Sequence, residues 1–163
     1  MATYTLLVSV TDIKQTSFVD ENVDDVTIRN VIWNAQQFYI IPLLGTGLYD
    51  DIEDAVINNN PTADETTLLT KIRPVLIWYT LYEGVIPFAI KIRNKGIQKL
   101  NSDNSQPVSD SELNDLMDKF KDWAEEYADR CKNYLVENAA TKFTKYLNAG
   151  SAADTIHPEK TTF

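Results

Sequence analysis

The chain has 163 residues, of which 44% are hydrophobic and 24% charged, and these ordinary values exclude a disordered or fibrous protein. Acidic residues outnumber basic ones by 24 to 15, so the formal charge of −9 disfavours general binding of DNA or RNA. Cys131 and His157 are the only cysteine and histidine, which excludes an intrachain disulfide and a Cys/His zinc site. The composition favours one folded domain.

The first residues predict a short strand followed by a short helix. Residues 1–10 are typical of a strand or an extended arm, and Thr11 is an N-cap candidate for a helix that begins at Asp12. We therefore divide the chain into this arm, a helical domain at 11–148, and an extended C-terminal arm at 149–163 with too few apolar residues to fold alone.

Two amphipathic helices come next, because apolar residues recur every three or four positions within 28–39 and again within 48–57. Pro42 predicts a break after the first of them, since the residue before a proline is pushed out of the α region. Gly45 and Gly47 then predict a sharp corner, with Gly45 as the C-cap of the first helix.

The corner "PLLGTGLYDDIEDA" invites comparison with a phosphate-binding loop. A Walker loop needs lysine and serine or threonine after its last glycine, and a dinucleotide fingerprint needs glycine where this chain has Asp50. Asp50 and Asp51 would also repel an anion from the first turn of the second helix. The corner is therefore interpreted as a turn between two helices.

The most apolar stretch, residues 75–90, predicts a central buried helix. Pro74 suits its first turn, after a separate short helix near Asp64, and Gly84 and Pro87 are expected to kink or end it. The stretch has 16 residues, whereas a membrane span needs about 20 apolar ones, so we expect no membrane partner.

The alternation of isoleucine with basic residues near 90–100 predicts a β-hairpin, although a fraying helix end fits the pattern equally. The basic cluster of this region consists of Lys91, Arg93, Lys95 and Lys99. It is interpreted either as a solvated hairpin edge, which lysine protects from aggregation, or as a contact surface for an acidic partner or a second copy.

The longest helix is predicted after Ser109 or Asp110, with one apolar stripe from Leu113 to Leu135 and a break near Asn138. Its opposite face is charged. These predictions together give an all-α fold: a small helical bundle with one long C-terminal helix, a short N-terminal strand, the hairpin and an extended C-terminal tail.

Motifs for catalysis are missing from this sequence. Cys131 lies on the apolar stripe and is interpreted as a core residue, and His157 lies beside Pro158 in the polar tail. A carboxylate-bridged metal centre would need a Glu-x-x-His spacing that the chain does not contain. We predict a protein that is not an enzyme, with no catalytic residue, no cofactor and no metal site.

Three segments in this order resemble the small head-tail connector (neck or adaptor) proteins of tailed bacteriophages, most closely those of phages that infect Bacteroidetes. They are "VTDIKQTSFVDENVDDVTIRNVIWNAQQFYIIPLLGTGLYDDI", then "IRPVLIWYTLYEGVIPFAIKIRNKGI", then the long acidic helix, and together they span roughly residues 11–147. The shared features are patterns of packing residues.

The resemblance implies a virion protein that forms a ring, commonly of twelve copies, beneath the portal. The ring would extend the DNA channel and provide the platform on which the tail docks. The implied partners are further copies of the chain, the portal protein, and a tail or further neck protein, with DNA only as non-specific passing cargo. The implied location is the virion neck, after assembly in the host cytoplasm.

The resemblance also suggests roles for particular residues. Contacts with partners are expected from the basic cluster and from four residues of the tail: Thr155, Ile156, His157 and Phe163. Four acids of the long helix are expected to face the channel, where they would let DNA slide without sticking: Asp122, Glu125, Glu126 and Asp129.

Two other functions fit the same sequence. One is a different virion ring or a tail-completion protein. The other is a cytoplasmic helical module that binds proteins and has no role in the virion.

Overall fold

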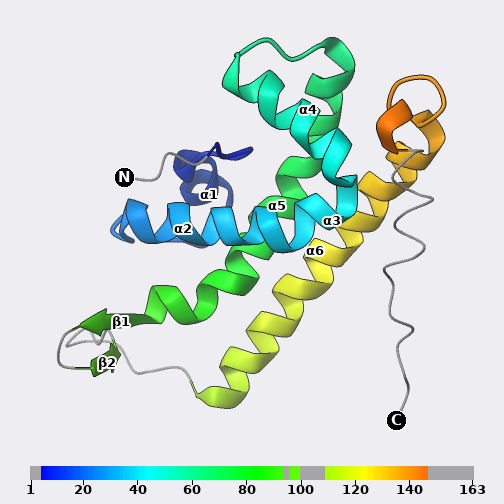
Figure 1. The fold of residues 1–163 in the computed structure, drawn as a ribbon. Helices are drawn as coiled ribbons and strands as arrows, with labels where there is room; N and C mark the ends of the chain where they lie inside the picture. Colours follow the sequence, from blue (N-terminus) through cyan, green and yellow to red (C-terminus); the bar gives the residue numbers. More distant parts are fainter. Residues whose placement is uncertain (1–4, 94–95, 100–108, 147–163) are drawn as a thin grey trace.

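The computed structural model describes residues 5–93, 96–99 and 109–146 (Figure 1). This part of the chain is mostly helical, which confirms the all-α prediction. The proposed tail at 149–163 lies outside the described residues, so the domain boundary there remains a prediction.

The predicted N-terminal strand is wrong for the residues that are described. Residues 5–9 form no strand, and helix α1 (Val10–Thr16) begins one residue before the predicted N-cap Thr11. Ser9 is the N-cap instead: its hydroxyl accepts a 3.0 Å hydrogen bond from the Asp12 backbone N–H, and the Asp12 carboxylate accepts one from the Ser9 N–H. This reciprocal capping box fixes the helix start.

Three helical segments join into one continuous rod, α2 (Asp25–Ala35), the π-helix η1 (Gln36–Ile40) and α3 (Ile41–Leu44) (Figure 1). The break predicted at Pro42 is therefore wrong. In the wide π turn the Ile41 N–H donates to the Gln36 carbonyl, and this wider turn accommodates Pro42 at the start of α3 without ending the rod.

The glycine corner forms as predicted. Gly45 has a φ of 75° and a ψ of 152°, is the C-cap of α3, and directly precedes α4 (Thr46–Ile57). A side chain at this φ would be strained, which explains the glycine. Gly47 is different, because it lies within the first turn of α4 and does not form the corner.

Helix α5 (Ala63–Ala89) runs without interruption through Pro74 and Gly84 and ends two residues after Pro87, as expected for a proline that ends the helix. The sequence prediction of two helices here, separated before Pro74, is wrong. A proline inside a helix costs about 3 kcal/mol in isolation, but α5 packs against α2, η1, α4 and α6, and burial on these sides outweighs the lost hydrogen bonds.

Helix α5 continues directly into β1 (Ile90–Arg93), whose backbone pairs antiparallel with β2 (Gly96–Lys99). Helix α6 (Asp110–Asn138) then runs back along α5, with Ser109 as N-cap and Glu112 completing a second capping box. Trp78 of α5 meets Trp123 of α6 near the middle of both helices, and Lys71, nearer the start of α5, meets Tyr134, nearer the end of α6, so the two helices are antiparallel.

One hydrophobic core lies where these helices meet. Its fully buried side chains come from every helix, and α5 supplies the most of them. The largest are Ile13, Ile28, Ile32, Ile40, Leu44, Ile52, Leu68, Ile72, Leu76 and Leu135. Cys131 is also fully buried in this core, as predicted, and burial raises the pKa of its thiol to about 11.

Candidate functional site

The four acids predicted to face a channel all lie exposed on α6. Glu126 pairs with Arg130 at 2.8 Å, and Glu125 lies 3.8 Å from the Lys121 ammonium. Helical spacing places Asp122, Glu125 and Asp129 on the side of α6 away from the core, in line with two further exposed acids. We call these five the acid ridge: Asp115, Asp118, Asp122, Glu125 and Asp129.

The acid ridge borders a cluster of buried and partly buried tyrosines on α5 and η1. The rings of Tyr39 and Tyr79 stack at 3.7 Å between centroids, and the Tyr39 hydroxyl donates a 2.5 Å hydrogen bond to Glu83. Burial raises the pKa of Tyr79 to about 12, and the charges of Glu125 and Asp129 add to this effect. Burial and Glu83 likewise raise the pKa of Tyr39. Both phenols are thus held protonated as packing groups.

The structure describes the backbone of three of the four residues in the basic cluster. Lys91 and Arg93 belong to β1 and Lys99 to β2, where the backbone register pairs Lys91 with Gln98. Lys95 lies outside the described residues. The role of this cluster therefore stays a prediction.

The tail residues expected to contact partners also lie outside the described residues: Thr155, Ile156, His157 and Phe163. The described chain stops shortly before them, at Tyr146. The structure does define how the residues just before the tail, up to Tyr146, are held to the helical body.

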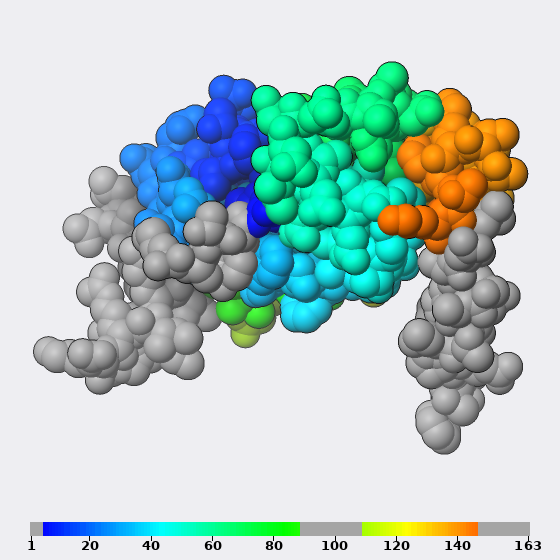
Figure 2. Space-filling view, turned by 45° about the horizontal axis from the view of Figure 1, so that its top comes forward, coloured from blue at the N-terminus to red at the C-terminus, as the bar shows by residue number. Residues whose placement is uncertain are grey.

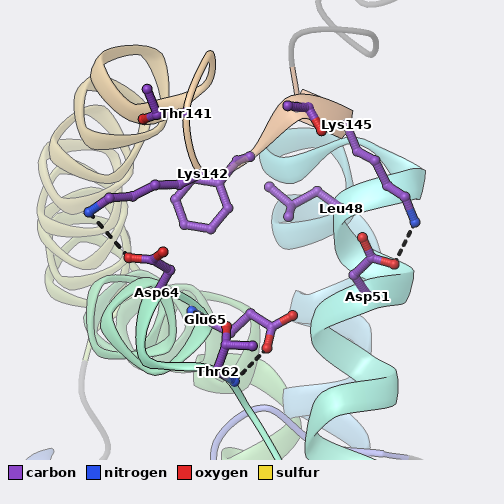
Figure 3. Close-up of a pocket in the computed structure, with 10 residues that line it drawn as sticks. Leu48, Asp51, Thr62, Asp64, Glu65, Thr141, Lys142 and Lys145 are labelled. Carbon is purple, nitrogen blue, oxygen red and sulfur yellow. Dashed lines mark hydrogen bonds and ion pairs between the residues drawn. The ribbon is translucent and has the colours of Figure 1, made fainter.

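Residues 141–146 are attached to the body at an open hollow of about 380 Å³ between α4 and the start of α5 (Figure 3). Lys142 pairs with Asp64 of α5 at 3.2 Å, and Lys145 pairs with Asp51 of α4 at 2.5 Å. Phe143 between them is buried and packs against Tyr134. Figure 2 shows the same attachment from outside, with the orange residues after α6 lying against α4 and the start of α5.

The hollow does not have the chemistry of a metal or catalytic centre. Its carboxylates Asp51 and Asp64 are paired with lysines, and Glu65 accepts a 2.7 Å hydrogen bond from the Thr62 N–H as a helix cap. No group of three or more His, Cys, Asp or Glu side chains among the described residues could hold a metal ion. The hollow is a structural attachment.

One exposed feature was missed at the level of sequence. Four aromatic side chains meet at the surface where the loop after α1 reaches the α5–α6 pair, and we call them the aromatic face: Phe18, Trp78, Phe120 and Trp123. Phe18 is 76% exposed and Trp123 40% exposed. Trp123 falls beside the predicted apolar stripe of α6 without belonging to it, which was the available signal.

Comparison with known proteins identifies one family. Residues 40–156, more than half of the chain, match a family described as "Family of unknown function (DUF6712)". Neither a curated protein nor a solved structure is significantly similar to the chain. Among the described helices, none is both long and apolar enough to cross a membrane.

Proposed function

The chain belongs to the DUF6712 family, and we propose that it is a structural virion protein, a head-tail connector. In this proposal, twelve copies of the chain form a ring beneath the portal, which extends the DNA channel and provides the docking platform for the tail. The protein would assemble in the host cytoplasm and remain in the neck of the virion. It would use no cofactor and catalyse no reaction.

The observation that carries the proposal is the acid ridge of α6. Five exposed carboxylates follow one another along α6 from Asp115 to Asp129, fourteen residue steps or about 21 Å. DNA binds tightly to proteins through contacts between its phosphates and cationic side chains. A surface lined by carboxylates offers no such cations and repels the phosphates. A ring with α6 turned inward would therefore let DNA pass without retaining it.

Contacts between copies would be made by the parts that lie around the rigid helical body. The basic cluster on the β1–β2 hairpin would meet an acidic surface of the next copy, and residues 155–157 and Phe163 would reach a neighbour or the portal. A contact between two different patches of the same protein closes into a ring when the rotation between copies is suitable.

Electron cryo-microscopy of particles that carry this protein tests the assignment directly. We expect a ring of copies between the portal and the tail. A ring elsewhere in the particle would instead support another virion ring or a tail-completion protein. Absence from purified particles would overturn the proposal and favour a cytoplasmic protein-binding module.

The role of the acids is tested by neutralising the four predicted channel residues together (Asp122→Asn, Glu125→Gln, Glu126→Gln and Asp129→Asn). We expect particles with this variant to eject DNA roughly tenfold more slowly, because passing phosphates lose the repulsion that keeps them from the wall.

A matched control neutralises four acids elsewhere (Glu21→Gln, Asp50→Asn, Asp54→Asn and Glu137→Gln). Both variants carry a formal charge of −5, from −9 plus four, so a general charge effect would slow them equally. Equal ejection rates for the two variants would count against a channel-facing α6.

A further inference from the structure

We propose that the aromatic face binds an amphipathic, positively charged helix of a partner protein. This inference goes beyond the proposed function and does not depend on it. It follows from the exposure of the aromatic rings, from the contacts that hold them in place, and from the charge of the two elements that carry them.

The aromatic face leaves large apolar side chains in contact with solvent. Phe18 is 76% exposed, although its ring centroid lies 6.2 Å from that of Trp78 and 6.5 Å from that of Phe120. Trp123 is 40% exposed and meets Trp78 edge to face at 4.7 Å between centroids. Contiguous exposed apolar surface is typical of a protein interaction site, and tryptophan is common among the residues that contribute most to binding.

Phe18 is fixed in its outward position by its neighbours in the loop after α1. The Ser17 hydroxyl donates a hydrogen bond to the Ile13 carbonyl and accepts one of 3.3 Å from the Val19 N–H. The Val19 side chain is buried in the core, so the chain is anchored on both sides of Phe18. A ring held in this way loses little conformational freedom when a partner binds, which favours affinity.

The aromatic face continues into a row of side chains along α6. Leu116, Phe120, Trp123 and Tyr127 follow one another at intervals of four, three and four residues, so they lie along one side of the helix. Helix α6 packs chiefly on α5, and Leu116 is left 41% exposed. The row covers about 17 Å, which matches three turns of a second helix lying beside it. A partner helix with apolar residues three and four positions apart therefore fits this row.

Both elements that carry the aromatic face are acidic. Helix α6 has nine acidic and four basic residues, and residues 17–24 have three acidic residues and no basic one. Exposed acids close in sequence to the apolar side chains of the face include Asp20, Glu21, Asp115 and Asp122. Carboxylates arranged around an apolar surface attract a cationic segment and repel an anionic one.

Two cations adjoin the row without cancelling this charge. Arg130 is already paired with Glu126 at 2.8 Å. Lys119 has Asp115 four residues before it and Asp122 three residues after it, so both acids lie beside it on the helix surface. The surroundings of the row therefore remain negative.

The same charge argues against other occupants of the face. Two copies of the chain that paired through their aromatic faces would bring two acidic helices together, which is unfavourable. DNA, RNA and anionic lipid surfaces would likewise be repelled. A cationic helix of a different protein is the occupant that both the apolar and the charged features favour.

Binding of a labelled synthetic peptide to the full chain tests the proposal. The probe is the 14-residue amphipathic helix LKKLLKLLKKLLKL, and its matched control carries glutamate in place of every lysine. By fluorescence anisotropy we expect the lysine peptide to bind roughly tenfold more tightly than the glutamate peptide, or better. Raising the salt concentration from about 50 to about 500 mM should weaken its binding by roughly tenfold.

Two variants locate the binding site on the aromatic face. Phe18→Ser and Trp123→Ser should each weaken binding of the lysine peptide roughly tenfold, because each removes an exposed aromatic side chain. The matched control Val136→Ser changes an apolar side chain that is 61% exposed on the opposite side of α6, and it should leave binding unchanged. Phe18 lies outside the helices, so its variant tests the face even if Trp123→Ser disturbs α6.

Failure of the unmodified chain to bind the lysine peptide would overturn the proposal. Equal affinities for the two peptides, or equal effects of Trp123→Ser and Val136→Ser, would do the same. Self-association that rises with protein concentration, and that Trp123→Ser abolishes while Val136→Ser does not, would assign the face to a second copy and would also overturn it.

These outcomes are independent of the connector proposal. A peptide-binding face in a protein that is absent from particles would stand without the proposed function, and a ring found in particles would stand without the binding face.

Discussion

Helices α5 and α6 are nearly equal in length, with 27 and 29 residues, and they pack against each other along most of their course, yet their surroundings differ. Helix α5 contacts α2, η1, α4 and α6, and it is apolar around most of its circumference. Helix α6 packs chiefly on α5 and buries only Phe120, Ala124, Cys131 and Leu135 fully. Stability therefore resides mainly in α5, and α6 is free to present charge and aromatic side chains.

The largest expected effect comes from removing the same side chain on each helix. Leu76→Ala in α5 leaves a cavity at a fully buried site and should lower the free energy of unfolding by about 3 to 4 kcal/mol. Leu116→Ala in α6, where the leucine is 41% exposed, should cost less than about 1 kcal/mol. Urea denaturation measures both, and equal losses would remove the distinction between the two helices.

A smaller effect is expected from replacing a buried polar side chain, Gln36, whose hydrogen bonds hold residues 5–7 to the helical body. Gln36 is fully buried in η1, where its carbonyl accepts a 2.7 Å hydrogen bond from the Leu7 N–H and its amide donates to the Thr5 carbonyl and the Tyr49 hydroxyl. Gln36→Leu leaves these groups without their partner and should cost about 2 to 3 kcal/mol in urea denaturation.

The control for this change is Asn34→Leu, which makes a similar substitution at an exposed position two residues earlier in the rod. It should alter the free energy of unfolding by no more than about 0.5 kcal/mol. If Gln36→Leu proved equally mild, the amide would not be what holds residues 5–7 to the body.

The smallest effect is expected where the tyrosine cluster of α5 meets the acids of α6. The pKa of Tyr79 is about 12 in the folded chain against an ordinary 10.0, so above pH 10 the unfolded chain releases a proton that the folded chain retains. The stabilisation is complete below pH 10 and is lost as the pH rises towards 12.

Tyr79→Phe removes this contribution. The loss of stability between pH 9 and pH 11, measured by urea denaturation, should be smaller in the variant by about 1 kcal/mol. An unchanged pH dependence would show that Tyr79 does not titrate differently in the two states.

Much of the fold follows from local patterns in the sequence. The helices at 28–39 and 48–57, the Gly45 corner and the start of α6 at Ser109 were all predicted, because periodicity, capping and positive φ depend on neighbouring residues. Cys131 was placed in the core for the same reason, since it lies on the apolar stripe.

The failures share a different cause. Pro42 and Pro74 predicted interruptions that the chain does not make, because the π turn before Pro42 and the packing around α5 compensate for the missing hydrogen bonds, whereas α5 does end two residues after Pro87. Residues 1–10 predicted a strand, but the described residues Thr5 and Leu7 hydrogen-bond to the Gln36 side chain and not to another strand. The π turn is local, but the helices that pack around α5 and the Gln36 partner of residues 5–7 are distant in sequence.

The candidate site divides in the same way. The exposed acids of α6 could be predicted, because a charged helix face repeats with a regular period. The aromatic face could not, because Phe18 lies some sixty residues from Trp78 and about a hundred from Phe120 and Trp123. The attachment of residues 141–146 likewise joins lysines to Asp51 and Asp64 across most of the chain.

The sequence by itself thus determined which segments are helical, where most helices begin, and which face of α6 carries charge, because these properties arise from interactions over a few residues. Only the tertiary structure decided that helices continue through Pro42 and Pro74, that Gln36 anchors residues 5–7, and that four distant aromatic rings meet at one surface. Those outcomes depend on burial and on partners that only the packed chain brings together. The free energy gained from this packing exceeds the local preferences of the residues, so it cannot be predicted from short sequence patterns.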